Sequence, residues 1–520
     1  MSESVDDGGE EHAFSEDSTY QQDGEGQKRP RLQVRRGDIM LRELVEDIEL
    51  WRGSDGRGYA TLEVNGHREH WHVMGEGFAN WLRLRVQLRS EPMLGAAEVE
   101  RLAVNLNARC LGLGQLHEVC HRVGRRDGNI YIDLADDQCR AVEIVPAKAD
   151  TAERWRVIDR PPVRFLRTPG MRAMPAPAPG GRIEDFRRWI NVETEAHFRL
   201  TIAWVLACYR DRGPFPILLL RGGQGSGKST LTRLLLRLVD PQQADVRSPP
   251  KEERDLWVAA QHARVLAYDN LSSVSPALAD GFCRISTGGA FAARTLNTDD
   301  DETILRACQP VLLNAIVDLA RRPDLADRAL LIEAKRLTGE GRRDEEGFWA
   351  EFAEEEPLLL GAVFDAVSAA LGAYEETPVP AKLRMADAAR WAESVAPFLN
   401  WRPGDLSEWW RQNRMAGDLT VIESDIVGLP LVAFLDEQGE SWEGTTSELH
   451  TRLTDAVSDK VRRSKGWPLN AHQLRSTLDR LRDALETAGW VFDRVKGTHG
   501  TRRLIFSRVA VAGDAAAAPG

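Results

Sequence analysis

The stretch "RGGQGSGKST", residues 221–230, places glycines, a lysine and hydroxyls in the pattern G-x-x-x-x-G-K-[ST]. Glycines let successive backbone N–H groups turn toward phosphate oxygens, and the N-terminal end of a following helix adds positive potential. The lysine would contact the β- and γ-phosphates, and the next hydroxyl would bind Mg²⁺. The sequence therefore predicts a site for a nucleoside triphosphate, formed by Gly222, Gly223, Gln224, Gly225, Ser226, Gly227, Lys228, Ser229 and Thr230.

Two apolar segments farther along the chain each end on a polar residue. "ARVLAYDN" runs to Asp269, and "QPVLLNAI" contains Asn314. We expect the first strand to neighbour the one before the glycine-rich loop, so that Asp269 holds the same Mg²⁺ as Ser229 through water. Asp269 as a simple strand-end cap is the alternative. An amide at Asn314 could orient the water that attacks the γ-phosphate.

Two further residues bear on turnover. Arg328 follows Asn314 by 14 residues, in "RPDLADRALLIE", and its planar, permanently charged fork suits a phosphoryl group in transfer. A surface ion pair is the alternative role for it. Asn270 stands directly after Asp269, at a position where a glutamate could act as general base. An amide can position water but cannot accept its proton, so this residue leaves binding intact and makes the rate of hydrolysis an open question.

These elements together resemble a known family. Residues 185–340 are similar to a superfamily 3 helicase, closest to the ATPase module of phage and poxvirus-type primase-helicases, whose bacterial relatives are described as phage-associated ATP-binding proteins. The resemblance rests on the glycine-rich loop, the two strand-end residues, "DLADR", and the hairpin-like stretch "RISTGGAFAARTLNTDDDE" between Asp269 and Asn314, which has a polar tip.

The resemblance implies an ATP- and Mg²⁺-dependent helicase that forms a hexameric ring. In such a ring each chain projects a hairpin into a central channel that holds single-stranded DNA. Arg294 would contact DNA phosphates, with Thr295 and Asn297 nearby. The ATPase roles of the family fall on Lys228, Ser229, Asp269, Asn314 and Arg328. Asn270 departs from the pattern, because many AAA+ ATPases have a glutamate as general base at this catalytic position.

The C-terminal segment predicts a second contact with DNA. Within an acidic protein, residues 440–508 carry a surplus of basic over acidic side chains. "GTTSELHTRLTDAV" and "NAHQLRSTLDRLRDALETAGW" have helical spacing, and "VFDRVKGTHGTRRLIFSR" predicts two strands around a glycine-containing turn. Two helices followed by a hairpin are similar to a winged helix. A protein-protein module is the alternative. The residues expected to meet DNA phosphates are Arg475, Arg480, Arg482, Lys496, Arg502 and Arg503.

The elements that must position these residues define the expected fold class. Strands and helices alternate from "FPILLL" to about residue 337, which favours an α/β P-loop core of the AAA+-like kind. An α+β domain precedes it and the winged-helix domain follows. The expected parts are a disordered acidic tail (1–37), an N-terminal accessory domain (38–160), a Pro/Gly-rich linker (161–181), the ATPase core (182–340), a helical lid region (341–400), a connector (401–439), the winged-helix domain (440–508) and a disordered tail (509–520).

The N-terminal domain offers less specific signals. "GHREHWHV" and "CLGLGQLHEVCH" contain His and Cys, but the alternation of His117, Val119 and His121 favours strands over a zinc site. "NIYIDLADDQCRAVEIV" predicts two strands around a turn rich in aspartate, rather than a primase metal site. A separate primase would then prime the DNA.

Composition sets outer bounds. The 520 residues have a formal net charge of −12, but residues 1–27 alone contain nine acidic and no basic side chains. The rest carries about −3, which does not exclude nucleic acid as a partner. No apolar run reaches the length of a membrane span, no signal peptide is evident, and the six scattered cysteines favour a reduced cytoplasmic protein. Two other functions stay open: a small-molecule kinase, and an ATP-gated DNA-binding switch or loader.

Overall fold

The computed structural model describes residues 20–22, 28–30, 45, 48–88, 95–148, 153–271, 274–294, 302–315, 322–337, 344–381, 383–496 and 502–509. The chain forms two compact units, each held together by contacts among its own residues. One comprises residues 1–63 and 71–116, and the other comprises residues 64–70 and 117–520. All the residues predicted to bind nucleotide or DNA belong to the second unit.

A parallel four-stranded sheet is the centre of the second unit. Its strands lie in the order β12-β15-β11-β16. Their bounds are β11 (Ile217–Arg221), β12 (Leu266–Leu271), β15 (Val311–Ala315) and β16 (Ala329–Glu333). Continuous apolar runs produce such strands because both faces of a parallel sheet are covered. Thus Leu218 and Leu220 join one hydrophobic cluster, whereas Ile217 and Leu219 join another.

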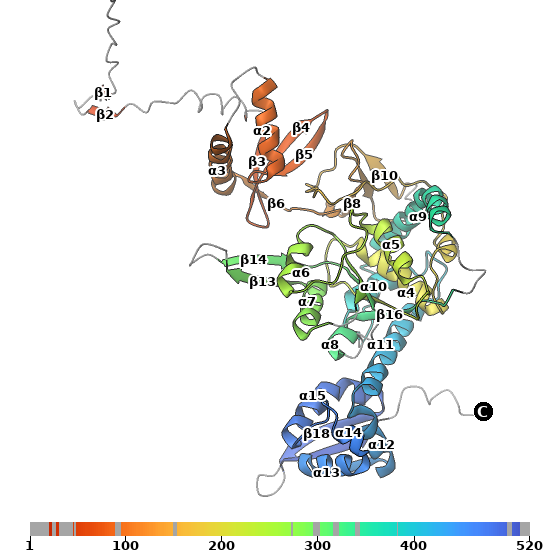
Figure 1. Cartoon of the computed structure of the whole chain (residues 1–520). Helices are drawn as coiled ribbons and strands as arrows, with labels where there is room; N and C mark the ends of the chain where they lie inside the picture. The colour runs from red at the N-terminus through yellow and green to blue at the C-terminus, as the bar shows by residue number, and fades with distance from the viewer. Residues whose placement is uncertain are drawn as a thin grey trace, which may run out of the picture. The chain divides into compact units, whose positions relative to one another are not determined.

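Helices surround this sheet (Figure 1). They are η1 (Ile183–Arg188), α4 (Glu195–Cys208), α5 (Lys228–Val239), α6 (Glu253–Ala260), α7 (Pro276–Thr287) and α8 (Pro323–Ala326). The sequence predicts an ordinary helix at "IEDFRRWINV", but only a 3₁₀ helix forms there. Strands β13 (Gly289–Arg294) and β14 (Glu302–Ala307) pair as an antiparallel hairpin that extends away from α6 and α7 (Figure 1).

A second, antiparallel sheet shares the core of the parallel one. Its order is β10-β9-β8-β7, with bounds β7 (Val123–Arg126), β8 (Asn129–Asp133), β9 (Ala141–Ile144) and β10 (Trp155–Ile158). Ile130 and Val142 belong to the same buried cluster as Leu218 of β11. The division between compact units therefore falls after residue 116, and not at the predicted boundary of 160. The predicted linker is extended, but Val163, Phe165 and Met174 in it are buried.

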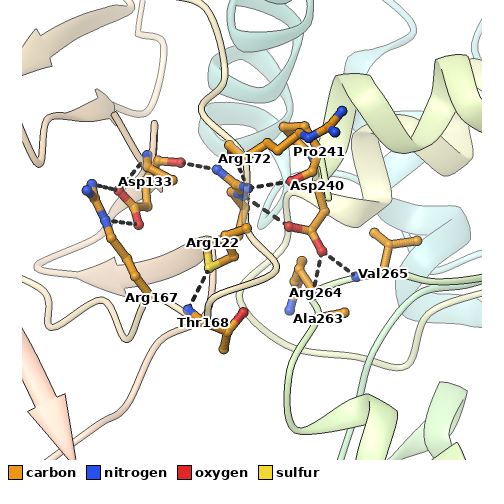
Figure 2. Close-up of polar contacts among 12 residues, drawn as sticks. Arg122, Asp133, Arg167, Thr168, Arg172, Asp240, Pro241, Ala263, Arg264 and Val265 are labelled. Carbon is orange, nitrogen blue, oxygen red and sulfur yellow. Dashed lines mark hydrogen bonds and ion pairs between the residues drawn. The ribbon is translucent and has the colours of Figure 1, made fainter. Parts of the chain in front are cut away.

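A buried arginine joins this second sheet to the residues that follow α5 (Figure 2). Arg122 is fully buried, and its Nε donates to Asp240 Oδ1 at 3.1 Å. Its two other nitrogens donate to the carbonyl oxygens of Asp133, Arg172 and Pro241. Asp240 Oδ2 accepts from the backbone N–H groups of Arg264 and Val265, just before β12. A buried charge needs this degree of pairing, so the cluster fixes the C-terminal end of α5 against the start of β12.

The first unit contains β3 (Glu49–Gly53), α2 (Glu76–Leu88) and α3 (Ala96–Leu113), together with all but the last residue of β4 (Gly58–Val64) and of β6 (Gln115–His117). Of β5 (His67–His72) it contains only residues 71–72. The β4–β5 hairpin turns at Asn65 and Gly66, both at positive φ, as the Asn-Gly pair predicts. Helical spacing in "GAAEVERLAVNLNARCLGL", residues 95–113, predicts a helix that α3 confirms. The strand expected from the alternation of His117, Val119 and His121 is wrong for most of its length, because β6 covers only residues 115–117. Within the acidic tail predicted to be disordered, β1 (Tyr20–Gln22) pairs with β2 (Lys28–Pro30).

Long helices follow the parallel sheet: α9 (Glu345–Ala373), α10 (Ala386–Val395), α11 (Asp405–Ser424) and α12 (Gly428–Gln438). By length and composition α9 could cross a membrane, but 67% of its apolar window is buried inside the protein. The predicted connector, residues 401–439, forms α11 and α12, and α11 packs on the edge strand β16. Asn413 of α11 accepts from Leu331 N and donates to Leu331 O. These bonds give partners to backbone groups on the outer side of β16, which an edge strand would otherwise leave unpaired.

The C-terminal part contains more elements than the sequence predicts (Figure 1). The predicted helices and strands correspond to α13 (Thr446–Ala456), α15 (Ala471–Thr487), β18 (Trp490–Lys496) and β19 (Arg502–Arg508). A short helix, α14 (Asp459–Arg462), and a strand, β17 (Ser441–Thr445), are additional. The sheet order is β17-β19-β18, so β19 is central.

Candidate nucleotide site

The glycine-rich loop connects the end of β11 to the start of α5. Gly222, Gly225 and Gly227 have positive φ values of 140°, 78° and 75°, which side-chain-bearing residues rarely adopt. A Cβ atom on Gly222 would also lie 2.8 Å from the carbonyl oxygen of Ala334. Lys228 Nζ donates to the carbonyl oxygens of Gly222 and Gly223 at 2.8 and 3.0 Å. The lysine ammonium is thus held over the loop whose N–H groups are predicted to bind phosphate.

Three of the predicted side chains meet at the carboxyl ends of the strands. Asn314, only 1% exposed, donates from Nδ2 to Asp269 Oδ1, and the same nitrogen lies 3.5 Å from Ser229 Oγ. The strand order explains the contact, because β15 lies between β11 and β12. The expectation that the Asp269 strand neighbours β11 is therefore wrong, and Asn314 fills the space between Asp269 and Ser229.

The donor set fits a hydrated divalent cation. Mg²⁺ prefers hard oxygen ligands and keeps several of its waters. Asp269 and Ser229 supply such oxygens, and Asn314 Oδ1 is buried without a hydrogen-bond partner among the described residues. A buried acceptor left unsatisfied by protein needs a partner such as a water molecule. Ser229 and Asp269 are accordingly the residues that would hold the ion.

Asn270 occupies a backbone irregularity. The pairing of β12 with β15 shifts register between Tyr268 and Leu271, and Asn270 has a positive φ of 55°. Asparagine tolerates this left-handed conformation better than most residues. Its side chain is exposed, and its backbone N–H donates to Asp269 Oδ1 at 2.8 Å. The bulge therefore accounts for the residue type at this position and orients the Asp269 carboxylate.

Another carboxylate at the same edge of the sheet lies too far away to replace a general base. Glu333 ends β16 and pairs with Arg221 at 3.2 Å. Two strands, β11 and β15, separate β16 from the strand of Asp269. With strands about 4.8 Å apart, Glu333 lies roughly 14 Å from Asp269 across the sheet.

Arg328 lies at the amino-terminal ends of the strands, which we call the amino edge of the sheet. The carboxyl-terminal ends, where Ser229, Asp269 and Asn314 lie, are the carboxyl edge. Arg328 directly precedes β16, whereas Lys228 follows β11, and these two strands are parallel neighbours. A five-residue strand spans about 16 Å, so the two side chains of one chain are held apart. Arg328 Nη1 donates to the carbonyl oxygen of Asp324 at 2.7 Å, while Nε is buried without a partner among the described residues.

The residues proposed for DNA contact in the hairpin are only partly described. Arg294 is the last paired residue of β13, opposite Glu302 of β14. Thr295 and Asn297, and the side chain of Arg294, lie outside the described residues. The base of the hairpin is fixed where Phe291 stacks on Trp257 of α6, with ring centroids 6.1 Å apart.

In the C-terminal part, some predicted DNA contacts are used within the chain. Arg480 pairs with Asp425, and Arg503 pairs with Glu443 at 3.0 Å. Arg482 donates to the carbonyl oxygen of Phe492 at 2.8 Å and covers its ring.

The other three side chains are exposed: Arg475, Lys496 and Arg502. They have no ion-pair partner among the described residues. These three are therefore the cations of the predicted set that are available to a phosphate chain.

A further group of metal-ligating side chains was missed by the sequence patterns, which linked His67 to His70 and His72. In the structure, His67, Glu69 and Cys139 have ligand atoms within 4.8 Å of one another. Burial raises the pKa of the Cys139 thiol to about 11, and Arg167 donates to its sulfur at 3.1 Å. A guanidinium at the thiol disfavours a metal cation there.

Comparisons with known proteins agree with a role in replication. Residues 183–397 match the family model of actinomycete integrative conjugative element replication proteins, and residues 427–516 match that of the C-terminal domain of the same proteins. No curated protein matches the chain. The matches support a role in the DNA replication of a mobile element.

Solved structures give distant likenesses. The C-terminal region of NrS-1, in its A form without ligand, is 11% identical, with a TM-score of 0.36 over 90% of this chain and 98% of that one. JCV helicase is 14% identical, with a TM-score of 0.20 over 43% of this chain and 66% of that one. These TM-scores are too low to establish a common fold.

Proposed function

We propose that this chain, which resembles replication proteins of actinomycete integrative conjugative elements over residues 183–397 and 427–516, is an ATP-driven DNA motor of the superfamily 3 type. The observation that carries the proposal is the contact of Asn314 with both Asp269 and Ser229 beside the glycine-rich loop. Three residues from separate parts of the sequence meet where a γ-phosphate and its attacking water would lie.

Each residue of this site has a separate role in the proposal. The loop N–H groups and Lys228 bind the phosphates, and Ser229 and Asp269 hold Mg²⁺. The bound ion would neutralise charge on the phosphate oxygens. Asn314 keeps the Asp269 carboxylate in place through its N–H group and offers its free Oδ1 to the attacking water. The position of the water then depends on an amide, because Asn270 cannot serve as a base.

Arg328 completes the site of a neighbouring chain. Its separation from Lys228 within one chain means that it can contact only the γ-phosphate of another chain. A ring, expected to be a hexamer, brings the amino edge of one sheet to the carboxyl edge of the next. An arginine supplied in this way stabilises the charge that develops during phosphoryl transfer.

DNA is the proposed cargo of the ring, which acts in the cytoplasm. The β13–β14 hairpin would carry Arg294, Thr295 and Asn297 into a central channel around a single strand. The C-terminal domain, in the role of a winged helix, would add phosphate contacts through Arg475, Lys496 and Arg502. A primase on a separate chain would supply primers.

An ATP-gated switch or loader is the second candidate, and Asn270 favours it. The separating experiment measures ATP turnover with and without single-stranded DNA, together with the mass of the assembly. The motor predicts turnover that DNA stimulates and a particle of about six chains. Binding of ATP and DNA with no stimulated turnover would support the switch, whereas no binding of ATP would contradict both.

A further inference from the structure

A cavity of about 440 Å³ is lined by residues of α5 but by none of residues 222–230 of the nucleotide loop. Its walls come from the extended segment at residues 172–175, from α5, from the loop after α5, and from α9. Arg237 of α5 lines it, nine residues after Lys228. At 1.5 Å per residue, that arginine lies about 13 Å farther along the helix. The nearest lining residue of α5 is Arg233, about 7.5 Å along the helix from Lys228, and no residue of the glycine-rich loop lines the cavity. The cavity is therefore separate from the site at Lys228, and its size suits a small ligand.

Two buried residues in the walls of this cavity, Gln242 and Glu356, each have one polar atom without a hydrogen-bond partner among the described residues. Gln242 is 4% exposed and Glu356 is 1% exposed. Gln242 Nε2 and Glu356 Oε1 have no hydrogen-bond partner among the described residues, although Glu356 Oε2 accepts from Arg237 Nε at 2.8 Å. Leaving a buried donor and a buried acceptor unsatisfied is unfavourable. A ligand that both accepts and donates hydrogen bonds would satisfy the pair.

The rim carries two guanidinium groups in exposed ion pairs. Arg172 lies 3.5 Å from Asp245, with both side chains more than half exposed. Arg233 pairs with Glu345, whose side chain is 67% exposed. Exposed ion pairs contribute little free energy, so both carboxylates can turn to water when an anion approaches. The two arginine forks are suited to a phosphate group.

An aromatic side chain completes the walls. Trp349 of α9 lines the cavity, and the guanidinium of Arg237 lies 5.8 Å from its ring centroid. Indole rings stack favourably on nucleobases. The cavity contains three arginines and three carboxylates, Asp245, Glu345 and Glu356, so its charge is balanced. A bare anion would gain little here, and a ligand with a flat polar ring and one anionic group fits better.

We propose that this cavity binds a nucleoside phosphate at a second site, distinct from the site at Lys228. The phosphate lies between Arg172 and Arg233, and the base lies against Trp349. The edge of the base accepts from Gln242 Nε2 and donates to Glu356 Oε1. The ligand is either a free nucleotide or the terminal nucleotide of a DNA strand, since both present the same chemistry.

The test uses the full chain with Lys228→Ala, which removes binding at the glycine-rich loop. Isothermal titration calorimetry measures the binding of each of the four deoxynucleoside monophosphates, of inorganic phosphate, and of a short 5′-phosphorylated single strand. We expect one mononucleotide to bind at one site per chain. Adding Arg172→Gln and Arg233→Gln should weaken the affinity for this mononucleotide by at least about tenfold, because two charge-assisted contacts are lost. Arg182→Gln, an exposed arginine paired with Asp185, is the matched control.

The oligonucleotide identifies the source of the ligand. A single strand that displaces the mononucleotide and binds more tightly indicates a strand terminus, and one that does not displace it indicates a free nucleotide. A second variant, Gln242→Leu, should lower the affinity for the preferred mononucleotide more than it lowers the affinity for the other three. With Lys228 intact, the Arg172 and Arg233 changes should leave one nucleotide bound per chain, which separates failure of this site from failure of the proposed ATP site.

Three results would overturn the second site. The first is that no mononucleotide binds to the Lys228→Ala chain. The second is binding that is the same in the double-arginine variant as in the Arg182→Gln control. The third is displacement by inorganic phosphate at the same concentration as a mononucleotide, which would reduce the cavity to an anion site.

Discussion

The two edges of the parallel sheet differ in what they hold. At the carboxyl edge, Asn314 contacts both Asp269 and Ser229, and Lys228 donates to the carbonyl oxygen of Gly222 in the glycine-rich loop. At the amino edge, Arg328 contacts Asp324 of the same short segment, and its Nε has no hydrogen-bond partner in the part of the chain that the structure describes. The carboxyl edge thus contains the residues that we propose bind phosphate, whereas the amino edge presents a cation away from them.

This difference follows from the topology. In a parallel sheet every strand-end loop of one kind lies at one edge, so residues that follow strands meet and residues that precede strands cannot join them. Arg328 precedes β16 and is excluded from the cluster of its own chain. The proposal that two chains form one ATPase site rests on this separation, and the following changes test each edge.

The largest effect is expected at the carboxyl edge. Lys228→Ala should abolish measurable ATP binding and turnover, because the ammonium is the main cation of the loop and serves phosphate rather than the core. Equilibrium binding of labelled ATP measures the loss, and an unchanged melting temperature shows that the fold survives. Lys251→Ala, at an exposed lysine, is the control. Unchanged affinity in Lys228→Ala would remove the nucleotide-site assignment.

At the amino edge, Arg328→Ala should keep ATP affinity and lower turnover by roughly 10³-fold, the size of effect expected from an arginine that acts in phosphoryl transfer. Steady-state ATPase assays with matched ATP binding separate the two quantities. Arg384→Ala disrupts a nearby ion pair with Asp327 and should leave turnover within about twofold, as expected of an exposed pair. Equal losses in both variants would assign Arg328 a structural role.

Between Asp269 and Ser229, Asn314→Ala should lower turnover by about 10²-fold with little change in ATP affinity, since it removes a positioned amide at the reacting phosphate. Asn314→Gln keeps the amide one methylene farther out and tests position rather than chemistry. The ratio of turnover to affinity is the measured quantity. A loss of affinity as large as the loss of turnover would instead indicate a role in binding.

The sequence contains enough information for the cluster but not for its layout. The glycine pattern predicts the loop, because positive φ at Gly222, Gly225 and Gly227 is a property of residue type. Apolar runs ending in Asp269 and Asn314 predict the strands. Their order depends on crossovers between distant segments, and so the position of β15 between β11 and β12 was not predicted.

Domain limits and side-chain pairing were harder to predict. Residues 117–160 have the short strands of an accessory domain, and only tertiary packing shows that Ile130 shares a core with Leu218. Similarly, the basic surplus of residues 440–508 does not reveal that Arg480 and Arg503 have acidic partners, Asp425 and Glu443, which lie far away in sequence or on another strand.

The smallest effect is expected from substitutions in the C-terminal domain, away from both ends of the parallel strands. Lys496→Gln with Arg502→Gln should weaken DNA binding and reduce the slope of log affinity against log salt by about 1.4 for single-stranded DNA, because two phosphate contacts release fewer counterions. DNA-free turnover should not change. Arg482→Gln should barely alter the slope, since that side chain already donates to the carbonyl oxygen of Phe492. Fluorescence anisotropy over a salt series measures both, and equal slopes would make the C-terminal domain a protein-interaction module.

The central claim is that one ATPase site is built from two chains, and mixing two inactive variants tests it most directly. Lys228→Ala chains keep Arg328, and Arg328→Ala chains keep the carboxyl-edge cluster. When subunits exchange, some interfaces regain an intact Lys228 on one side and an intact Arg328 on the other. The account predicts that the mixture hydrolyses ATP faster than either variant alone. A mixture that exchanges fully yet stays inactive, or a wild-type chain that is fully active as a monomer, would contradict it.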